Sequence, residues 1–115
     1  MRRGEIRTVA LDAARGAEAY RRRPAVIVSI DAANAAAMRL GRGVVTVVPV
    51  TSSVEPLHPF QVLLPASDTG LARDAKALAE QVRSVAMERL GQRLGVVPNA
   101  IMLEIDEALR LHLAL

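Results

Sequence analysis

The chain has no cysteine, and its 115 residues include only two histidines, His58 and His112. Without thiols there is no disulfide framework and no thiolate metal site, and two histidines so far apart do not indicate a metal centre. No apolar run approaches the roughly 20 residues that a membrane-spanning helix needs. Residues 1–5 lack the apolar stretch of a secretory signal. These absences favour a cytoplasmic protein that does not enter the membrane and uses no metal or other cofactor.

Aromatic residues are also nearly missing, since Tyr20 and Phe60 make up the whole 2%. Stacking on aromatic rings therefore cannot dominate recognition of a nucleic acid. Phe60 is expected in the hydrophobic core, which leaves Tyr20 as the one candidate for stacking on a base.

Lysine is almost absent as well, with Lys76 alone against fourteen arginines. The net charge of +3 is uneven, because residues 1–42 hold nine arginines against four carboxylates. Such a concentration predicts a basic face, and the usual partner of a basic face is a polyanion. The arginine excess favours forked contacts to phosphates or bases, although a GC-rich genome explains it equally well.

The densest positive charge lies at Arg21, Arg22 and Arg23, directly before Pro24 and the apolar run 25–30. Pro24 fixes its own φ angle and restricts Arg23 to an extended conformation. A permanently charged planar donor on a stiff strand edge suits a phosphate. A solvated basic turn leading into a core strand is the alternative, and the sequence leaves both open.

Hydrophobic patterns predict one domain over residues 1–115, mainly β with some α. Strands are expected at 4–11, 25–30, 44–50, 60–64 and 78–85, the last of which a helix would also fit. A polar loop is expected at 12–22, and a strand end or bulge near Thr51, because Pro49 breaks the third run. Asp31 is expected to cap a helical turn over 32–38, and a second helical turn is expected over 87–94. Pro98 should open a final helix, packed through Ile101, Ile105, Leu109 and His112 or Leu113. The elements predict a strongly bent sheet or barrel with a C-terminal helix.

Six segments in order and at compatible spacing resemble the MazF/PemK family of toxin endoribonucleases. They are RGEI at 3–6, RGAE at 15–18, RPAVIVS at 23–29, VPVTS at 48–52, PFQV at 59–62 and AEQVRS at 79–84. The resemblance implies an SH3-like barrel of the MazF/CcdB type and a homodimer. It also implies metal-independent cleavage of single-stranded RNA at short specific sequences, and neutralisation by an acidic, MazE-like antitoxin.

The same resemblance places the family's catalytic arginine on Arg23 and its catalytic threonine on Thr51. Such chemistry uses the 2′-hydroxyl of the RNA as nucleophile and leaves 2′,3′-cyclic phosphate and 5′-hydroxyl ends. The protein must hold the attack in line, offset charge on the phosphorane-like transition state and move protons. We assign Arg23 to transition-state stabilisation, with protonation of the leaving group as an open second role, and Thr51 to positioning.

Neither residue is a general base at neutral pH, because arginine keeps its proton until about pH 12 or above. Glu18 is one candidate for that role, since it shares the polar loop that leads to Arg23. The favoured alternative is a surface carboxylate paired with Arg21 or Arg22. Neither His58 nor His112 is expected to be catalytic, although histidine titrates in a suitable range.

RNA contacts are expected from three places along the chain. The predicted residues are Arg15, Glu18, Tyr20 and Arg22 in the polar loop, Ser52 and Ser53 after the threonine, and Gln81 with Arg83. Gln81 either reads a base edge or is buried as a tie between strands. Arg7 stands where the family commonly has an aromatic residue, so the resemblance does not indicate which bases are preferred.

Two other functions compete with RNA cleavage. A gyrase-poisoning toxin of the CcdB type would act by binding protein and would need no pair of Arg23 and Thr51. An inactive SH3-like interaction module would need an aromatic-lined groove, for which this chain has too few aromatic residues.

Overall fold

The computed structural model of the protein describes residues 1–11 and 22–115. The predictions for Arg15, Glu18, Tyr20 and Arg21, and for the loop at 12–21, fall outside these residues. No helix in the described part is long and apolar enough to cross a membrane.

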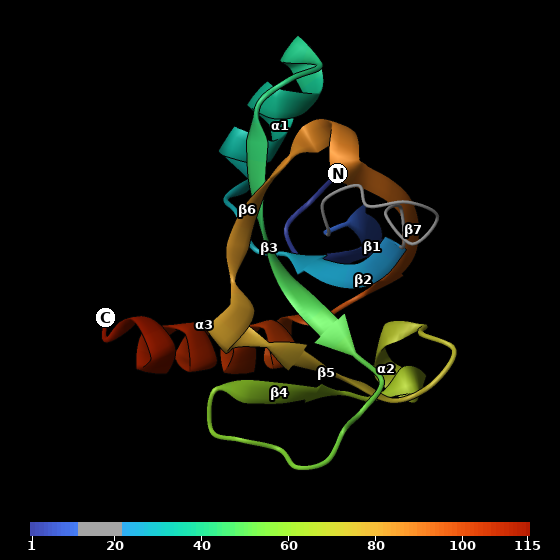
Figure 1. Ribbon diagram of the computed structural model, residues 1–115, viewed down its shortest axis with the longest axis vertical. Coiled ribbons are helices and arrows are strands. Elements are labelled where there is room, and N and C mark those ends of the chain that lie inside the picture. The colour runs from blue at the N-terminus through green and yellow to red at the C-terminus, as the bar shows by residue number, and fades with distance from the viewer. Residues whose placement is uncertain (12–21) are drawn as a thin grey trace.

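Seven strands and three α-helices make up the described fold (Figure 1). The strands are β1 (Glu5–Ala10), β2 (Arg22–Ile27), β3 (Val44–Thr51), β4 (Gln61–Leu64), β5 (Ala75–Leu78), β6 (Arg83–Ala86) and β7 (Leu90–Val96). The helices are α1 (Asp31–Leu40), α2 (Ala66–Thr69) and α3 (Asn99–Leu113), with two 3₁₀ turns, η2 (Ala79–Gln81) and η3 (Met87–Arg89).

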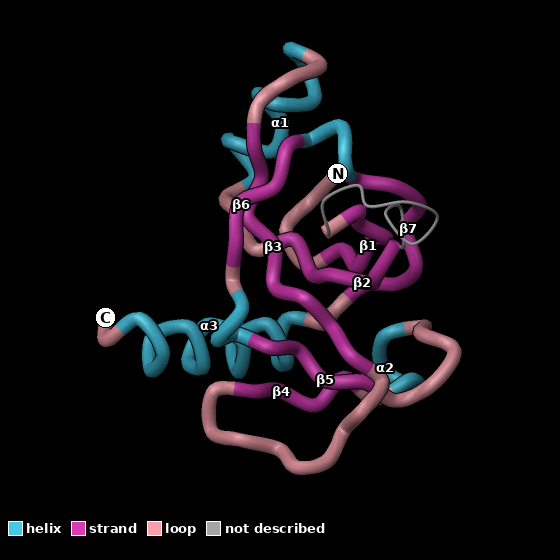
Figure 2. Tube along the Cα trace, viewed as in Figure 1, coloured by secondary structure: helices cyan, strands magenta, loops and turns pink. Residues whose placement is uncertain are grey.

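The long strand β3 organises the sheet, whose order is β4-β5-β3-β2-β1-β7 with antiparallel pairing throughout. One edge of β3 carries β2. The other edge pairs with β6 over Val44–Val47 and then with β5 at Val50 and Thr51, as Figure 2 makes visible. Because β3 belongs to both halves, the sheet bends around it. The predicted bent antiparallel sheet with a C-terminal helix is confirmed.

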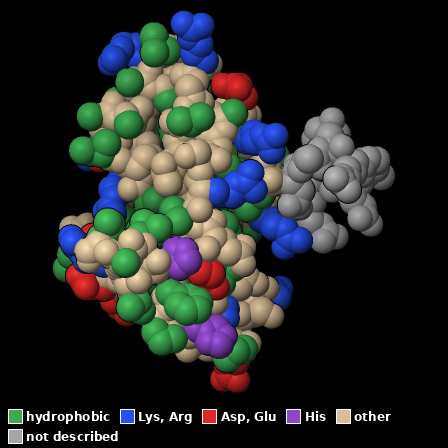
Figure 3. Space-filling view, turned by 60° about the vertical axis from the view of Figure 1, so that its left-hand side comes forward, with side chains coloured by type: hydrophobic (Ala, Val, Ile, Leu, Met, Phe, Trp, Pro, Cys, Tyr) green, Lys and Arg blue, Asp and Glu red, His purple; other side chains and the backbone are tan. Residues whose placement is uncertain are grey.

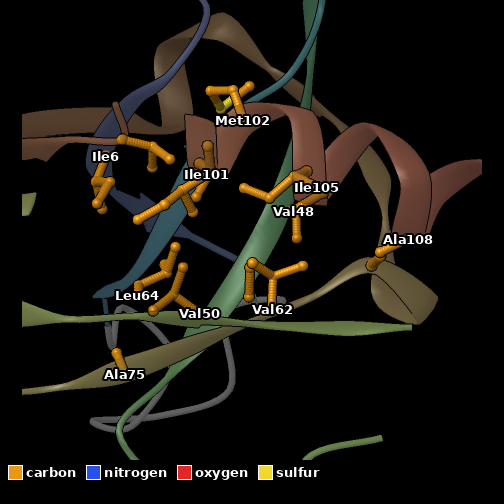
Figure 4. Packing of buried hydrophobic residues seen from close by; sticks show 14 residues of the cluster. Ile6, Val48, Val50, Val62, Leu64, Ala75, Ile101, Met102, Ile105 and Ala108 are labelled. Atoms are coloured by element: carbon orange, nitrogen blue, oxygen red, sulfur yellow. The ribbon is translucent and has the colours of Figure 1, made fainter. Parts of the chain in front are cut away.

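Residues on β2 and β3 alternate between two hydrophobic clusters, as the period of two in a strand requires. Val26, Val48 and Val50 belong to the first cluster, where Ile101, Met102 and Ile105 pack α3 onto β4 and β5 (Figure 4). The second cluster, on the opposite face of the sheet, is built by Val9, Leu11, Ala25, Ile27, Ala37, Val45, Val47 and Val85. The stripe predicted for the last helix is confirmed at Ile101 and Ile105, whereas His112 and Leu113 are exposed.

Two predicted elements in the second half are wrong. The strand expected at 78–85 is two strands, β5 and β6, separated by η2, where the Val82 amide donates to the Ala79 carbonyl. The helical turn expected over 87–94 is confined to η3 at Met87–Arg89, and the strand β7 follows directly. β7 lacks alternation because most of its residues are exposed or half-buried, and its pairing with β1 shifts register twice.

Three smaller expectations also need correction. Asp31 does not cap its helix through its side chain: Ile30 holds the N-cap position, and the Asp31 carboxylate instead accepts a hydrogen bond from the Arg3 amide at 2.6 Å. The strand end predicted near Thr51 is confirmed, but Pro49 does not interrupt β3, because it falls between the stretches paired to β6 and β5 and so needs no N–H on that edge. Phe60 is half-buried and belongs to neither cluster.

The ion pair of Glu5 with Arg7 should make stability depend on pH. Burial raises the pKa of Glu5, but the hydrogen bond and charge of Arg7, 2.9 Å away, outweigh it, so the pKa lies below 4.5. A folded-state pKa below the unfolded value adds stability above the unfolded pKa, and that stability disappears as pH falls through the folded pKa. Between pH 6 and pH 3, we expect the free energy of unfolding to fall more steeply for the wild type than for Glu5→Gln, measured by urea denaturation.

Asp31, whose pKa the Arg3 amide lowers, titrates in both proteins and so cancels in this comparison. Parallel curves for the two proteins would contradict the assigned role of Glu5.

Candidate active site

Arg23 leaves the sheet on the same face as Ala25 and Ile27, two residues of the second cluster. It pairs across the strands with Val9, and its own side chain is exposed at the end of that cluster. The apolar residues after Pro24 are buried and fix the strand, so the backbone of Arg23 lies near the start of a well-packed central strand while its side chain reaches solvent.

Thr51 is the last residue of β3 and lies on the same face as Val47 and Pro49. The observed register pairs Ala25 with Pro49 and Ile27 with Val47. Continued by two residues, this register sets Arg23 opposite Thr51. The Thr51 hydroxyl oxygen accepts a hydrogen bond from the Ser53 amide at 3.2 Å, which orients the side chain and leaves its hydrogen free to donate.

Gln81 and Arg83 approach the same place from the other edge of β3. Arg83 pairs with Val47 at the start of β6, and Gln81 ends the η2 turn between β5 and β6. One Arg83 nitrogen donates to the Leu11 carbonyl at 3.0 Å, which fixes the direction of its guanidinium. The turn that sequence analysis missed therefore brings both residues to the site.

A cavity of about 390 Å³ collects these side chains. Among residues 1–11 and 22–115 no carboxylate lines it; the lining residues there are Leu11, Arg23, Pro49, Val50, Thr51, Leu78, Gln81 and Arg83. The cavity is thus lined by the guanidiniums of Arg23 and Arg83, the hydroxyl of Thr51 and the amide of Gln81, and its other lining residues are apolar. The wall residues Leu11 and Leu78 were not predicted, and nothing in their local sequence distinguishes them from core residues.

The Arg23 guanidinium is free of protein partners among residues 1–11 and 22–115, which offer it neither a hydrogen bond nor an ion pair. Two nearby arginines do have partners: the Arg22 guanidinium donates to the Arg89 carbonyl at 3.2 Å, and the Arg89 guanidinium donates to the Ala10 carbonyl at 3.0 Å. With its donors unused in this part of the chain, Arg23 is the guanidinium best placed to bind an anion in the cavity.

Several predicted RNA-contacting residues do not line this cavity. Ser52 faces a second, mostly apolar cavity of about 430 Å³ with Pro24, on the opposite side of the strands. Arg22 and Ser53 are exposed and line neither cavity. Gln81 is exposed, so its alternative role as a buried tie between strands is wrong.

Both histidines lie away from the cavity. They flank Phe60, with ring centroids 5.7 Å from it for His58 and 6.3 Å for His112. In Figure 3 the two histidines lie among hydrophobic and acidic side chains, while a group of Lys and Arg side chains gathers higher on the visible face. Within the described ranges, no group of three His, Asp or Glu residues is arranged to hold a metal ion.

A bent antiparallel sheet thus holds a cavity whose described lining includes two arginines, a threonine and no carboxylate, and such a lining suits an anion. Comparison with known proteins makes the class specific. The chain belongs to the family of PemK-like, MazF-like toxins of type II toxin–antitoxin systems, whose model matches residues 2–113.

Individual relatives agree with this membership. The chain is 62% identical over 115 residues to the Endoribonuclease MazF9 of Mycobacterium tuberculosis, covering 100% of this chain and 98% of the relative. Among solved structures, an endoribonuclease in complex with its cognate antitoxin from a mycobacterial species matches with a TM-score of 0.79 and 28% identity, over 100% of this chain and 96% of that chain. MazF from Deinococcus radiodurans matches with a TM-score of 0.77 and 27% identity, over 100% and 97%.

Proposed function

We propose that this chain is the toxin of a type II toxin–antitoxin system and an endoribonuclease that cuts single-stranded RNA at specific sequences in the cavity of Arg23 and Thr51. The observation that supports the site is that Arg23 and Thr51 line the same cavity, in which the described residues contribute no carboxylate and offer the Arg23 guanidinium no partner. Such a lining suits a phosphate group.

The reaction follows from what these two side chains can do. The 2′-hydroxyl of the substrate gives its proton to solvent water or to Glu18, which stays a prediction for the base, and its oxygen bonds to phosphorus. The bond to the 5′-oxygen breaks and that oxygen takes up a proton, so the products carry a 2′,3′-cyclic phosphate and a 5′-hydroxyl. The Arg23 guanidinium offsets the charge that develops on the phosphoryl oxygens, and it can also give a proton to the departing 5′-oxygen. The Thr51 hydroxyl, oriented by the Ser53 amide, donates to a phosphoryl oxygen and holds the group in line.

Sequence selection is assigned to groups around this centre. Gln81 and Arg83 line the cavity and present an amide and a second guanidinium to a neighbouring nucleotide. Arg15, Glu18, Tyr20, Arg22, Ser52 and Ser53 remain predictions for contacts beyond the cavity. The proposed reaction needs no metal ion to generate its nucleophile, because the 2′-hydroxyl belongs to the substrate.

The proposal includes the partners and setting of such a toxin. We place the chain in the cytoplasm as a single-domain protein that forms a homodimer and is neutralised by an acidic, MazE-like antitoxin. Solved relatives include an endoribonuclease with its cognate antitoxin and MazE–MazF complexes. An acidic flexible segment would occupy the cationic cavity as the RNA backbone does, and it should therefore cover Arg23.

The activity can be tested on protein-free RNA in EDTA with the wild type and Thr51→Val. We expect discrete cuts with 5′-hydroxyl and cyclic-phosphate ends from the wild type, and a rate lower by about 10- to 100-fold from the variant, which keeps the shape of threonine and loses one hydrogen bond to the reacting group. Mapping the ends also gives the recognised sequence. RNA left intact by well-folded wild type would move the assignment to a toxin that binds protein.

A further inference from the structure

Lys76, the only lysine of the chain, is buried directly beside the proposed catalytic threonine. It is 6% exposed, and on β5 it pairs with Thr51 of β3 on one side and with Leu63 of β4 on the other. Opposite residues of antiparallel strands leave the same face of the sheet, with Cβ atoms about 5 Å apart. Arg23, Thr51 and Lys76 therefore follow one another along a single row across three strands.

The Lys76 ammonium does not point into the cavity, which it does not line. It donates instead to the Pro56 carbonyl and to the Gln61 side-chain oxygen, the latter at 2.9 Å. Pro56 lies in the connection 52–60, which leaves β3 immediately after Thr51. A buried ammonium is costly unless its donors are satisfied, so this connection is held against β5 by the lysine that neighbours the threonine.

Gln61 connects the Lys76 ammonium to two further groups through hydrogen bonds. Its side-chain oxygen also accepts a hydrogen bond from the His58 amide at 3.1 Å, and its nitrogen donates to the Glu80 carboxylate at 2.6 Å. Glu80 lies in η2, next to Gln81 of the cavity. One chain of hydrogen bonds thus joins the connection after Thr51 to the turn that presents Gln81. The other Glu80 oxygen is buried and has no partner in the described part of the chain, so the carboxylate depends on Gln61.

We propose that Lys76 is a positioning residue for RNA cleavage, which acts through Gln61 and Glu80 to fix Thr51 and Gln81 on two sides of the cavity. This inference rests on the proposed function. In-line attack needs the phosphate and its donors in a narrow range of geometry, and a shift of about 1 Å can cost on the order of 100-fold in rate. Loss of the ammonium frees the connection 52–60 and the turn together, so both contacts to the RNA loosen at once.

Lys76→Met removes the charge and keeps a stem of similar length. In single-turnover cleavage of the mapped RNA, we expect kcat to fall by about 10- to 100-fold while KM changes by less than about threefold. Val62→Ala is the control for stability, because it weakens the same pair of strands through packing alone. It should lower the melting temperature and keep kcat. Arg42→Met, in the exposed turn before β3, is the control for charge.

Glu80→Gln provides a second variant that keeps the shape of the network and weakens only its charged end. We expect it to lower kcat by about three- to tenfold, and the double variant Lys76→Met/Glu80→Gln to lose little more than Lys76→Met alone, because both act through Gln61. Full kcat in a folded Lys76→Met or in Glu80→Gln, or effects that multiply in the double variant, would overturn the proposal. Wild type that leaves RNA intact would instead refute the proposed function.

Discussion

Arg23→Ala is expected to lower the rate of RNA cleavage by about 10²- to 10³-fold, equivalent to ~3–4 kcal/mol of transition-state stabilisation. Arg23 lies near the start of the well-packed central strand β2 and its guanidinium is free of partners among the described residues, so its donors are available to the phosphate. Interactions of this kind strengthen as charge develops in the transition state. The loss should therefore appear in kcat under single-turnover conditions, with a smaller change in KM.

Two further variants sharpen this test. Arg23→Lys keeps the charge but not the forked geometry, and it should recover only part of the rate. Arg42→Ala removes one guanidinium from an exposed turn and leaves the cavity unchanged, so it should cut RNA at the wild-type rate. A fully active Arg23→Ala would show that the phosphate is bound elsewhere.

Gly95→Ala is expected to destabilise the fold by about 3 kcal/mol. A Cβ atom on Gly95 would lie 2.3 Å from the Thr69 carbonyl oxygen, at the point where β7 passes the end of α2. Backbone atoms cannot yield as a flexible side chain does, so the strand or the helix must move, and overpacking of this kind typically costs 1–3 kcal/mol. Urea denaturation should show the loss as a lower midpoint with an unchanged slope.

Gly41→Ala is the matched control for this substitution. Unlike Gly95, Gly41 is surrounded by open space, with nothing within 4 Å of an added Cβ. Its φ of 68° is in the left-handed region. The cost there is conformational and should be about 1 kcal/mol. Equal midpoints for the two variants would mean that the contact between Gly95 and Thr69 is looser than described.

The strands that carry the two proposed catalytic residues could be predicted because they are runs of buried, β-branched residues. Most residues of 25–27 and 45–50 are of this kind, and Thr51 ends β3 while Arg23 is the second residue of β2. The register that sets Arg23 opposite Thr51 could not be read locally, since it depends on how the two strands pair in space. The family resemblance named both residues without that geometry.

The second half of the site was harder to predict for physical reasons. Residues 78–85 contain four apolar and four polar residues without strict alternation and without glycine or proline, so the sequence did not indicate the η2 turn at Gln81. β7 contains Gly91, Gly95 and exposed polar residues, and its hydrogen bonds to β1 rather than its side chains define it. The hydrogen-bond network of Lys76, Gln61 and Glu80 joins β5, β4 and η2. A local sequence pattern cannot predict contacts between segments that come together only in the fold.

The buried lysine has a consequence for chemical labelling. Because Lys76 is the only lysine, reagents that modify lysine find no accessible lysine side chain on the folded chain, although the α-amino group still reacts. Acylation of Lys76 would occur only when β5 and the connection 52–60 separate, so its rate would measure the local opening of that region. A single lysine side chain thus reports on structural fluctuations next to Thr51.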